Sequence, residues 1–470
     1  MSDGIVGVGM ARALGRGWLV ALALLVAGCG SLPRIVPDMA LRKGPGPQLE
    51  NGRGPLSAQQ SKSILDRLKA RSPDASLLDH HLAFEEAVSG SPLTTGNKVD
   101  LLVDGPTTYA AMFAAIAGAR SHVNMETYIL EDDEIGRRFA EVLIAKQRAG
   151  VQVNLMYDSV GAIGTKKAFF EPLAAAGIRI VEYNPVNPLK AKAGWDVNER
   201  DHRKLLVVDG RIAVLGGINI SSVYSGGSLS RGAPQVGTGK PLPWRDTDVR
   251  IEGPAVGELQ KLFIENWEKQ KGAALPPRDY LPTLGNAGNE IVRAIGSRPD
   301  EPYSQIYATL VSAIQSAKVD ILLTNAYFVP DPQLLAVLKE AVARGVEVKL
   351  LLPSQSDSWL VLSAGRRFYG ELLAAGVKIY ERRGALLHSK TAVIDGVWST
   401  VGSTNLDWRS FVHNLELNAV VLGPEFGNRM RDMFERDLAA SSPVTLEQWN
   451  RRPIDARVME MIGALWQYWL

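Results

Sequence analysis

The sequence predicts an α/β protein made of two homologous halves. Short apolar runs rich in β-branched residues alternate with amphipathic stretches such as 134–149 and 333–344, which is typical of α/β layer folds. The chain also repeats itself: segments that begin VNMETYIL, AGVQVNLMYDS and DHRKLLVVDG return in the same order as VDILLTNAYFVP, RGVEVKLLLPS and LHSKTAVIDG. Glycines fall at corresponding places in the two copies, where a helix should end before a strand: Gly150, Gly177, Gly345 and Gly376.

Composition and charge narrow the classes of function. The chain has 470 residues, with 52 Lys and Arg against 50 Asp and Glu and a formal net charge of +2. A dedicated nucleic-acid binder normally carries a strong basic excess, so nucleic acid is a disfavoured partner. Apolar residues at 46% and charged residues at 22% are typical of a globular body rather than of a disordered or polytopic membrane protein.

The N-terminus has the layout of a secretory signal. Arg12 and Arg16 precede an apolar run over 18–27, and that run is too short to cross a bilayer core of about 30 Å as a helix. The residues that follow, VAGC over 26–29, resemble the bacterial lipobox, in which the cysteine receives diacylglycerol and becomes the first mature residue.

Cys29 is the only cysteine, which excludes an intramolecular disulfide and a cysteine-based metal cluster. We therefore predict a lipoprotein signal peptide over 1–28 and a lipid anchor on Cys29; the alternative is an uncleaved anchor in which this cysteine is buried. The anchor would hold the protein in the bacterial cell envelope, facing the periplasm. Gly30, where an Asp is absent, favours the outer membrane.

The remaining chain divides into segments. They are a Pro/Gly-rich tether over 29–56, an N-terminal helical segment over 57–95, the first half over 96–275, the second half over 285–445 and a C-terminal helix over 446–470. For the cluster of His80, His81, Glu85 and Glu86 we favour a solvated helix over a metal site. For the terminal aromatic residues Trp466, Tyr468 and Trp469 we favour packing on the core over a membrane interface.

Two copies of one spacing carry the candidate chemistry. The pattern H-x-K-x4-D-x6-G-[GS]-x-N comprises His202, Lys204, Asp209 and Asn219 in the first half and His388, Lys390, Asp395 and Asn405 in the second. His and Lys two positions apart on a strand point to the same face, and the small residues before the Asn allow close approach of a ligand. Two halves that face each other would bring two imidazoles, two ammonium groups and two carboxamides to one point.

This set of groups suits phosphodiester chemistry without a metal. The lysines and asparagines supply positive charge and hydrogen-bond donors to nonbridging oxygens. One neutral histidine can attack phosphorus to form a phosphohistidine, while the other, protonated, donates to the leaving alkoxide and then activates the acceptor hydroxyl. We expect no cofactor and no metal site, and we interpret His122 and His413, which lie outside the spacing, as structural.

The paired pattern resembles the duplicated HKD motif of the phospholipase D superfamily, and the resemblance covers about residues 96–440. It implies that each half is a mixed β-sheet flanked by helices, that the halves are related by a pseudo-twofold axis and that the active site lies between them. It also implies a mainly structural role for Asp209 and Asp395. By the same resemblance we assign His202 as nucleophile and His388 as general acid, and the reverse assignment is the alternative.

The resemblance also implies that the acidic partners of the two histidines lie outside the motifs. Aligning the Gly-Pro pair at 253–254 with that at 423–424 places Asp246 opposite Glu416, each opening a predicted strand. We assign these two carboxylates as the partners that orient the imidazoles, and Asp248 is the competing choice for the first.

Within the superfamily, the segment LHSKTAVIDGVWSTVGSTNLDWRS is similar to the corresponding segment of bacterial cardiolipin synthases. That similarity implies transfer of a phosphatidyl group from phosphatidylglycerol to a lipid alcohol, with phosphatidylethanolamine as a further candidate substrate. The alternatives are a phospholipase D that uses water as acceptor and, less favoured, a phosphodiesterase of nucleic acid. No obligate protein partner is predicted.

Two insertions flank the first motif and are missing beside the second. They run over 184–198 and 221–243. The first carries Lys190, Lys192 and Trp195, two ammonium groups and an amphipathic ring that suit anionic headgroups; the alternative is an ordinary surface loop.

Overall fold

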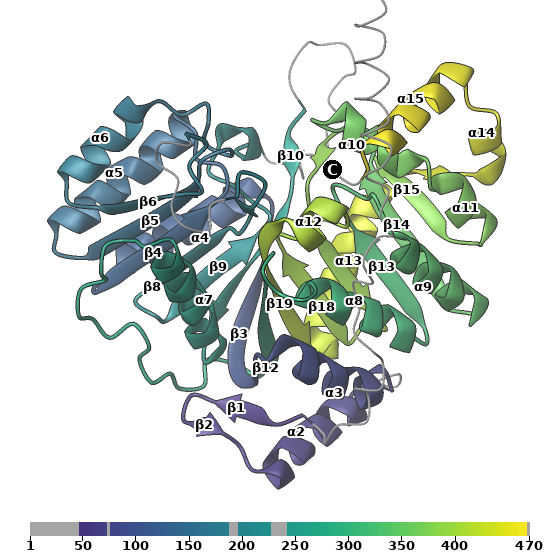
Figure 1. The fold of residues 1–470 in the computed structure, drawn as a ribbon. Helices are drawn as coiled ribbons and strands as arrows, with labels where there is room; N and C mark the ends of the chain where they lie inside the picture. Colours follow the sequence, from purple (N-terminus) through teal and green to yellow (C-terminus); the bar gives the residue numbers. More distant parts are fainter. Residues whose placement is uncertain (1–46, 73–75, 188–195, 227–241, 468–470) are drawn as a thin grey trace, which may run out of the picture.

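The computed structural model describes residues 47–72, 76–187, 196–226 and 242–467 (Figure 1). Several sequence predictions lie outside these residues: the signal peptide, the anchor at Cys29, most of the tether, the three residues singled out in the first insertion, and Tyr468 and Trp469. Within the described ranges, no helix combines the length and apolar character needed to cross a membrane.

The first half is built on a mixed sheet. Its strands lie in the order β6 (Arg179–Tyr183), β5 (Gln152–Asp158), β4 (His122–Thr127), β8 (Leu205–Val208), β9 (Ile212–Gly216), β11 (Thr247–Glu252) and β3 (Leu93–Val103). The first three are parallel, and each later neighbour is antiparallel. Parallel neighbours need a crossover connection, which the predicted amphipathic stretches supply as helices.

The second half repeats this order and these directions. Its strands are β15 (Lys378–Arg382), β14 (Glu347–Pro353), β13 (Asp320–Thr324), β17 (Thr391–Ile394), β18 (Trp398–Gly402), β19 (Asn414–Leu422) and β12 (Glu290–Ser297). The two sheets join where β12 pairs antiparallel with β3. The predicted α/β class, with two repeated halves that each contain a mixed sheet flanked by helices, is confirmed.

Helices cover the faces of both sheets. The outer face of the first sheet carries α4 (Gly105–Gly118), α5 (Glu134–Arg148) and α6 (Lys167–Ala175), and that of the second carries α8 (Gln305–Ser316), α9 (Pro332–Ala343) and α11 (Tyr369–Ala374). A central core contains α7 (Ala255–Lys269), α13 (Pro424–Ala439) and residues of both sheets. Alternation along the strands explains these layers: Leu205 and Val207 pack in the central core, whereas Leu206 and Val208 pack under the outer helices.

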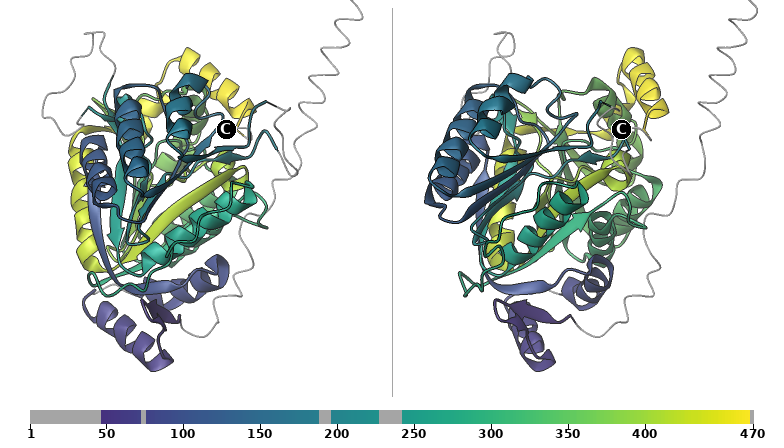
Figure 2. Two further views of the ribbon diagram at one scale, coloured as in Figure 1. Left: turned by 90° about the vertical axis from the view of Figure 1, so that its left-hand side faces the viewer. Right: turned by 60° about the vertical axis from the view of Figure 1, so that its left-hand side comes forward.

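A small N-terminal unit lies at one end of the molecule, purple in Figure 2. It contains β1 (Leu49–Asn51), β2 (Gly54–Pro55), α2 (Ala58–Ala70) and α3 (Leu77–Ser89). Strand β1 pairs parallel with β3 and Leu49 is fully buried, although these residues belong to the range that the sequence assigned to a tether. Helix α2 begins at a capping box formed by Ser57 and Gln60.

The solvated helix expected around His81 is wrong for one face of α3. His81 and Glu85 are completely buried because α3 packs against α8, where His81 Nδ1 lies 3.1 Å from Ser312 Oγ. Glu85 lies 3.9 Å from Arg293, and burial raises the pKa of its carboxyl. The sequence missed this polar cluster because its charges are paired across elements that are far apart in the chain.

The C-terminal region forms two helices instead of one. After β20 (Ser441–Val444), which extends the second sheet beside β15, the chain forms α14 (Leu446–Asn450) and α15 (Ile454–Leu465). Pro453 lies at the break, where its fixed φ and missing N–H suit the start of a new helix. Gly463 of α15 lies against α10 (Trp359–Arg366), at the end of the molecule opposite the N-terminal unit (Figures 1 and 2).

Candidate functional site

Two short strand pairs connect the halves at the motif residues. β7 (Arg200–Asp201) runs parallel to the start of β19, and β10 (Trp244–Arg245) runs parallel to β16 (Leu386–Leu387). One residue beyond these pairs, the His202 amide donates to the Leu415 carbonyl at 3.0 Å, and the His388 amide donates to the Arg245 carbonyl at 2.7 Å. Each motif histidine is therefore held by the backbone of the opposite half.

The imidazoles and their carboxylate partners are crossed between the halves. His202 Nδ1 lies 3.0 Å from Glu416 Oε1, and His388 Nδ1 lies 2.6 Å from Asp246 Oδ2. Asp248, the competing choice, instead accepts a hydrogen bond from the backbone amide of Ile218 at 3.1 Å. A carboxylate at Nδ1 fixes the ring orientation and leaves Nε2 for chemistry.

The two motif lysines lie beside the histidines of their own motifs, in the residues that immediately precede β8 and β17. Lys204 Nζ donates to the His202 carbonyl at 2.5 Å and lies 5.1 Å from the centre of the Tyr128 ring. Lys390 Nζ lies 2.9 Å from His388 Nδ1. Both lysines are buried, so they bring positive charge into a region from which water is largely excluded.

The motif asparagines are positioned differently in the two halves. Asn219 donates from Nδ2 to the Tyr224 hydroxyl at 2.9 Å and accepts at Oδ1 from the amide of Ile129 at 3.0 Å. Asn405 is also buried, but its Oδ1 has no hydrogen-bond partner among the described residues. The second carboxamide thus lines the pocket with a buried acceptor atom that has no protein partner in the described part of the chain.

The motif aspartates lie at turns behind the site rather than in it. Each occupies a left-handed conformation, with φ of 54° at Asp209 and 51° at Asp395. Their carboxylates accept hydrogen bonds from three successive backbone amides in each half: Arg120, Ser121 and His122 for the first, and Lys318, Val319 and Asp320 for the second. These carboxylates connect the turn after the motif strand to the start of the neighbouring strand.

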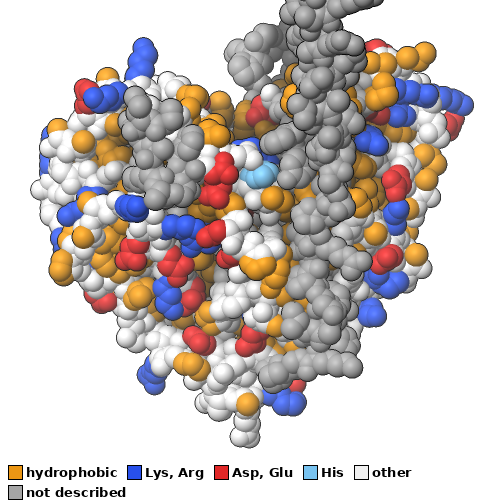
Figure 3. Space-filling view, viewed as in Figure 1, with side chains coloured by type: hydrophobic (Ala, Val, Ile, Leu, Met, Phe, Trp, Pro, Cys, Tyr) orange, Lys and Arg blue, Asp and Glu red, His pale blue; other side chains and the backbone are white. Residues whose placement is uncertain are grey.

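A pocket of about 270 Å³ connects the catalytic groups of the two halves. Its lining includes His202, His388, Asn219 and Asn405, and it adds residues that sequence reasoning missed: Tyr128, Arg200, Trp244, Tyr327, Asp357 and Arg409. Of these, Trp244 lies two positions before an assigned acid and Arg200 two positions before His202, which were usable signals. Arg409 lies in α12 (Trp408–Val412), and Tyr128, Tyr327 and Asp357 lie in loops with no motif spacing. Figure 3 shows histidine exposed in the hollow between the halves.

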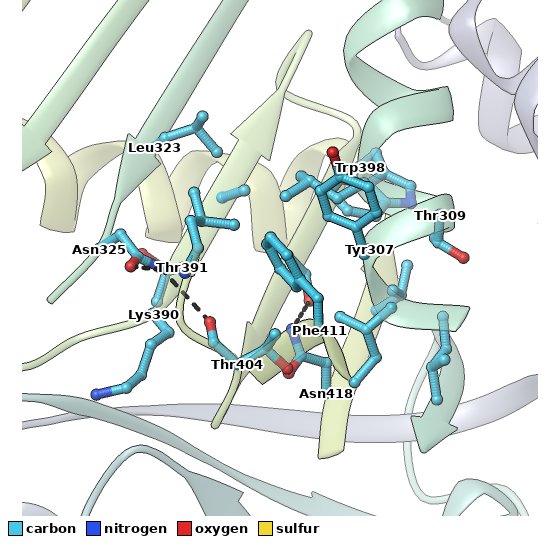
Figure 4. Close-up of a pocket in the computed structure, with 17 residues that line it drawn as sticks. Tyr307, Thr309, Leu323, Asn325, Lys390, Thr391, Trp398, Thr404, Phe411 and Asn418 are labelled. Carbon is cyan, nitrogen blue, oxygen red and sulfur yellow. Dashed lines mark hydrogen bonds between the residues drawn. The ribbon is translucent and has the colours of Figure 1, made fainter. Parts of the chain in front are cut away.

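A second, much smaller cavity of about 30 Å³ lies behind Lys390 in the second half (Figure 4). It has room for about one water molecule and is lined mainly by apolar side chains, among them Tyr307, Trp398 and Phe411. Asn325 borders it and accepts a hydrogen bond from the Leu406 amide at 3.1 Å, which fixes the chain next to Asn405. The cavity therefore lies within the packed side chains that support the site from behind.

Burial shifts the pKa values of the ionisable groups at the site. Desolvation lowers the pKa of His202 well below its usual value, and the positive charges of Lys204 and Lys390 lower it further. Desolvation also lowers the pKa of Lys204 to about 7, although the charge of Glu416 opposes this change. The pKa of Glu416 itself is raised by burial to about 7. An anion in the pocket would favour the protonated forms of these buried bases.

Only the ends of the insertions are described. Asn184 donates from Nδ2 to the carbonyls of Asp196 and Glu199, which closes the base of the first insertion. Arg409 of the second half donates to Asn198 Oδ1 at 3.1 Å, so this base contacts both halves. The first described residues of the second insertion include Tyr224, whose hydroxyl lies 3.4 Å from His388 Nδ1. In the described ranges, no group of three His, Cys, Asp or Glu side chains is arranged to hold a metal ion.

Comparison with known proteins gives consistent matches. A family model described as "Cardiolipin synthase, PLD-like domain" matches residues 112–224 and 310–438. The chain is 35% identical over 388 residues to the cardiolipin synthase of Geobacillus thermodenitrificans, covering 82% of this chain and 74% of that protein. It is 36% identical over 377 residues to the cardiolipin synthase of Geobacillus kaustophilus, covering 80% and 72%.

A solved structure with a similar fold is the phosphatidylserine synthase of Haemophilus influenzae. Its TM-score is 0.63 at 12% identity, and the match covers 82% of this chain and 99% of that chain. At this identity the likeness concerns the fold alone.

Proposed function

Because this chain belongs to the phospholipase D superfamily, as a cardiolipin synthase-like enzyme, we propose that it transfers a phosphatidyl group from phosphatidylglycerol to a lipid alcohol. The observation that carries the proposal is the crossed pair of imidazole–carboxylate contacts at one pocket, with both motif lysines beside them. Relatives that are named cardiolipin synthases support a phosphatidyl transfer that yields cardiolipin.

The proposed reaction has two displacements at phosphorus. In the first, His202 Nε2 attacks phosphorus, the bond from phosphorus to the oxygen of the headgroup glycerol breaks, and His388 gives its proton to that oxygen. Glycerol leaves, and the phosphatidyl group stays on His202. In the second, His388 takes a proton from the hydroxyl of a second phosphatidylglycerol, whose oxygen displaces the histidine and yields cardiolipin. Lys204, Lys390 and the two motif asparagines would bind the nonbridging oxygens throughout, in place of a metal ion.

The product distribution tests this proposal. We expect purified full-length protein with phosphatidylglycerol vesicles to form cardiolipin and glycerol in equal amounts, with EDTA present, as measured by mass spectrometry of the lipids. The same measurement with added phosphatidylethanolamine tests whether this lipid is a second substrate. Phosphatidic acid as the main product would instead indicate a hydrolase, and activity that EDTA removes and one divalent ion restores would contradict the metal-free mechanism.

Anion binding should depend on pH through Lys204. Its pKa is about 7 in the free pocket, and a bound phosphodiester should raise it, so binding takes up a proton at and above neutral pH. Affinity should therefore be greatest below pH 7 and fall by up to about tenfold per pH unit above it, until the pKa of the complex is reached. Calorimetry with a soluble diester analogue of fixed single charge, in buffers of different ionisation enthalpy, measures both quantities. Affinity that does not change between pH 6 and 8 would contradict this linkage.

A further inference from the structure

Helix α15 presents an apolar stripe to solvent. Its members recur at helical spacing and lie on one side of the helix: Ile454 (78% exposed), Val458 (43%), Met461 (65%), Ile462 (37%) and Leu465 (79%). Trp466, at the end of the helix, is 48% exposed, so the packing that the sequence favoured for this aromatic residue is incomplete. A stripe of this size on a terminal helix is unusual unless something covers it.

The opposite side of α15 is firmly packed. Gly463 lies so close to α10 that an added Cβ would stand 2.6 Å from the backbone nitrogen of Ala364. Glu460 is buried and accepts two hydrogen bonds from Arg452, each 2.7 Å long. The apolar stripe is therefore held in a fixed orientation, facing away from the protein.

Positive charge borders the stripe. A surface groove of about 630 Å³ is lined by Arg367, Arg452 and Arg457 together with Met461 and Leu465 of the stripe. Arg367 and Arg457 are exposed, and neither forms an ion pair with a carboxylate among the described residues. In Figure 3, hydrophobic side chains gather along the upper right rim over this region, with Lys or Arg side chains beside them.

The stripe lies near the opening of the catalytic pocket. Helix α10, on which α15 packs, contributes Val361 to the pocket lining, and Asp357 just before this helix also lines it. Trp359, in the first turn of α10, is 54% exposed. Figure 1 shows α10 and α15 at the same end of the molecule as β10, which carries Trp244 of the pocket.

We propose that the α15 stripe, together with Trp359 and the flanking arginines, docks the enzyme on the surface of an anionic phospholipid bilayer. Apolar side chains beside exposed arginines match the acyl and phosphate layers of such a surface. Docking here would place the pocket opening next to the membrane. The inference rests on the proposed function, since a lipid substrate gives this orientation its purpose.

Vesicle binding tests the proposal with matched variants. The full-length chain carrying Cys29→Ser serves as background, so that the proposed acyl anchor does not mask weaker contacts. In this background Met461→Glu with Leu465→Glu changes the stripe. The control is Leu281→Glu with Val319→Glu, two residues that are 47% and 42% exposed beside the turns of Asp209 and Asp395. Arg367→Gln with Arg457→Gln removes the flanking charge.

The stripe variant should bind phosphatidylglycerol vesicles at least about tenfold more weakly than the background in co-sedimentation, and the control should bind unchanged. The arginine variant should lose about fivefold for each charge on these vesicles and nothing on phosphatidylcholine vesicles. Turnover of a soluble short-chain phosphatidylglycerol and the melting temperature should stay unchanged in all three.

Equal vesicle binding by the stripe variant and the control would overturn the docking surface. So would light scattering that shows the stripe variant changing from dimer to monomer with vesicle binding intact, because a second copy would then be the occupant. A failure of the proposed function gives a different result from a failure of the docking surface. If the proposed function is wrong, the background protein itself does not turn over the soluble substrate, whereas a wrong docking surface leaves that turnover intact.

Discussion

His202→Ala and His388→Ala proteins should each lose phosphatidyl transfer by at least about a thousandfold, yet at different steps. Both imidazoles line one pocket, and each is oriented through Nδ1 by a buried carboxylate. With a donor whose leaving group needs no proton, the His388→Ala protein should still form the phosphatidyl adduct on His202 and then stop. His202→Ala should release no leaving group and carry no adduct.

Mass spectrometry of the intact protein and of its peptides checks this difference. His413→Ala is the matched control, because this histidine does not line the pocket and should leave turnover intact. An adduct recovered on His388 in the His202→Ala protein would reverse the proposed roles of nucleophile and general acid.

Removing either of the two carboxylates that pair with a histidine of the other half, Asp246 or Glu416, should have the second large effect on turnover. Asp246→Asn should lower turnover by about a hundredfold or more. With the donor whose leaving group needs no proton it should resemble His388→Ala, with a burst of leaving group followed by a slow step. Glu416→Gln should resemble His202→Ala, with a slow burst. The negative charge of Asp246 raises the pKa of His388 against the effect of burial, so its removal should also move the limb of the pH profile that belongs to His388 to lower pH.

Pre-steady-state kinetics separate the two steps, and Asp248→Asn provides the control. Asp248 is as deeply buried as Asp246 but bonds to backbone amides, so its replacement should lower the melting temperature and leave the ratio of burst to steady rate unchanged. If Asp246→Asn slowed the burst while Glu416→Gln spared it, the pairing between the halves would not govern the chemistry.

The sequence by itself determined the repeat, the α/β class and the motif residues proposed for the site. These depend on local information: alternation along strands decides which residues of 205–208 face each core, and the spacing from His202 to Asn219 is written within one stretch of chain. Asp209 belongs to this spacing as well, but its hydrogen-bond partners do not, because the three backbone amides that donate to it lie 87–89 positions earlier in the chain.

Only the tertiary structure decided which groups meet across the halves. Glu416 and His202 are 214 positions apart in the chain, and Asp246 and His388 are 142 apart. The strand pairs β7–β19 and β10–β16 bring them together, and these pairs form only when the two sheets dock. Likewise, the periodicity of 454–465 predicts an amphipathic helix but not which side is covered, because that depends on where α10 lies. Periodicity specifies a face, whereas the partner of that face depends on long-range packing.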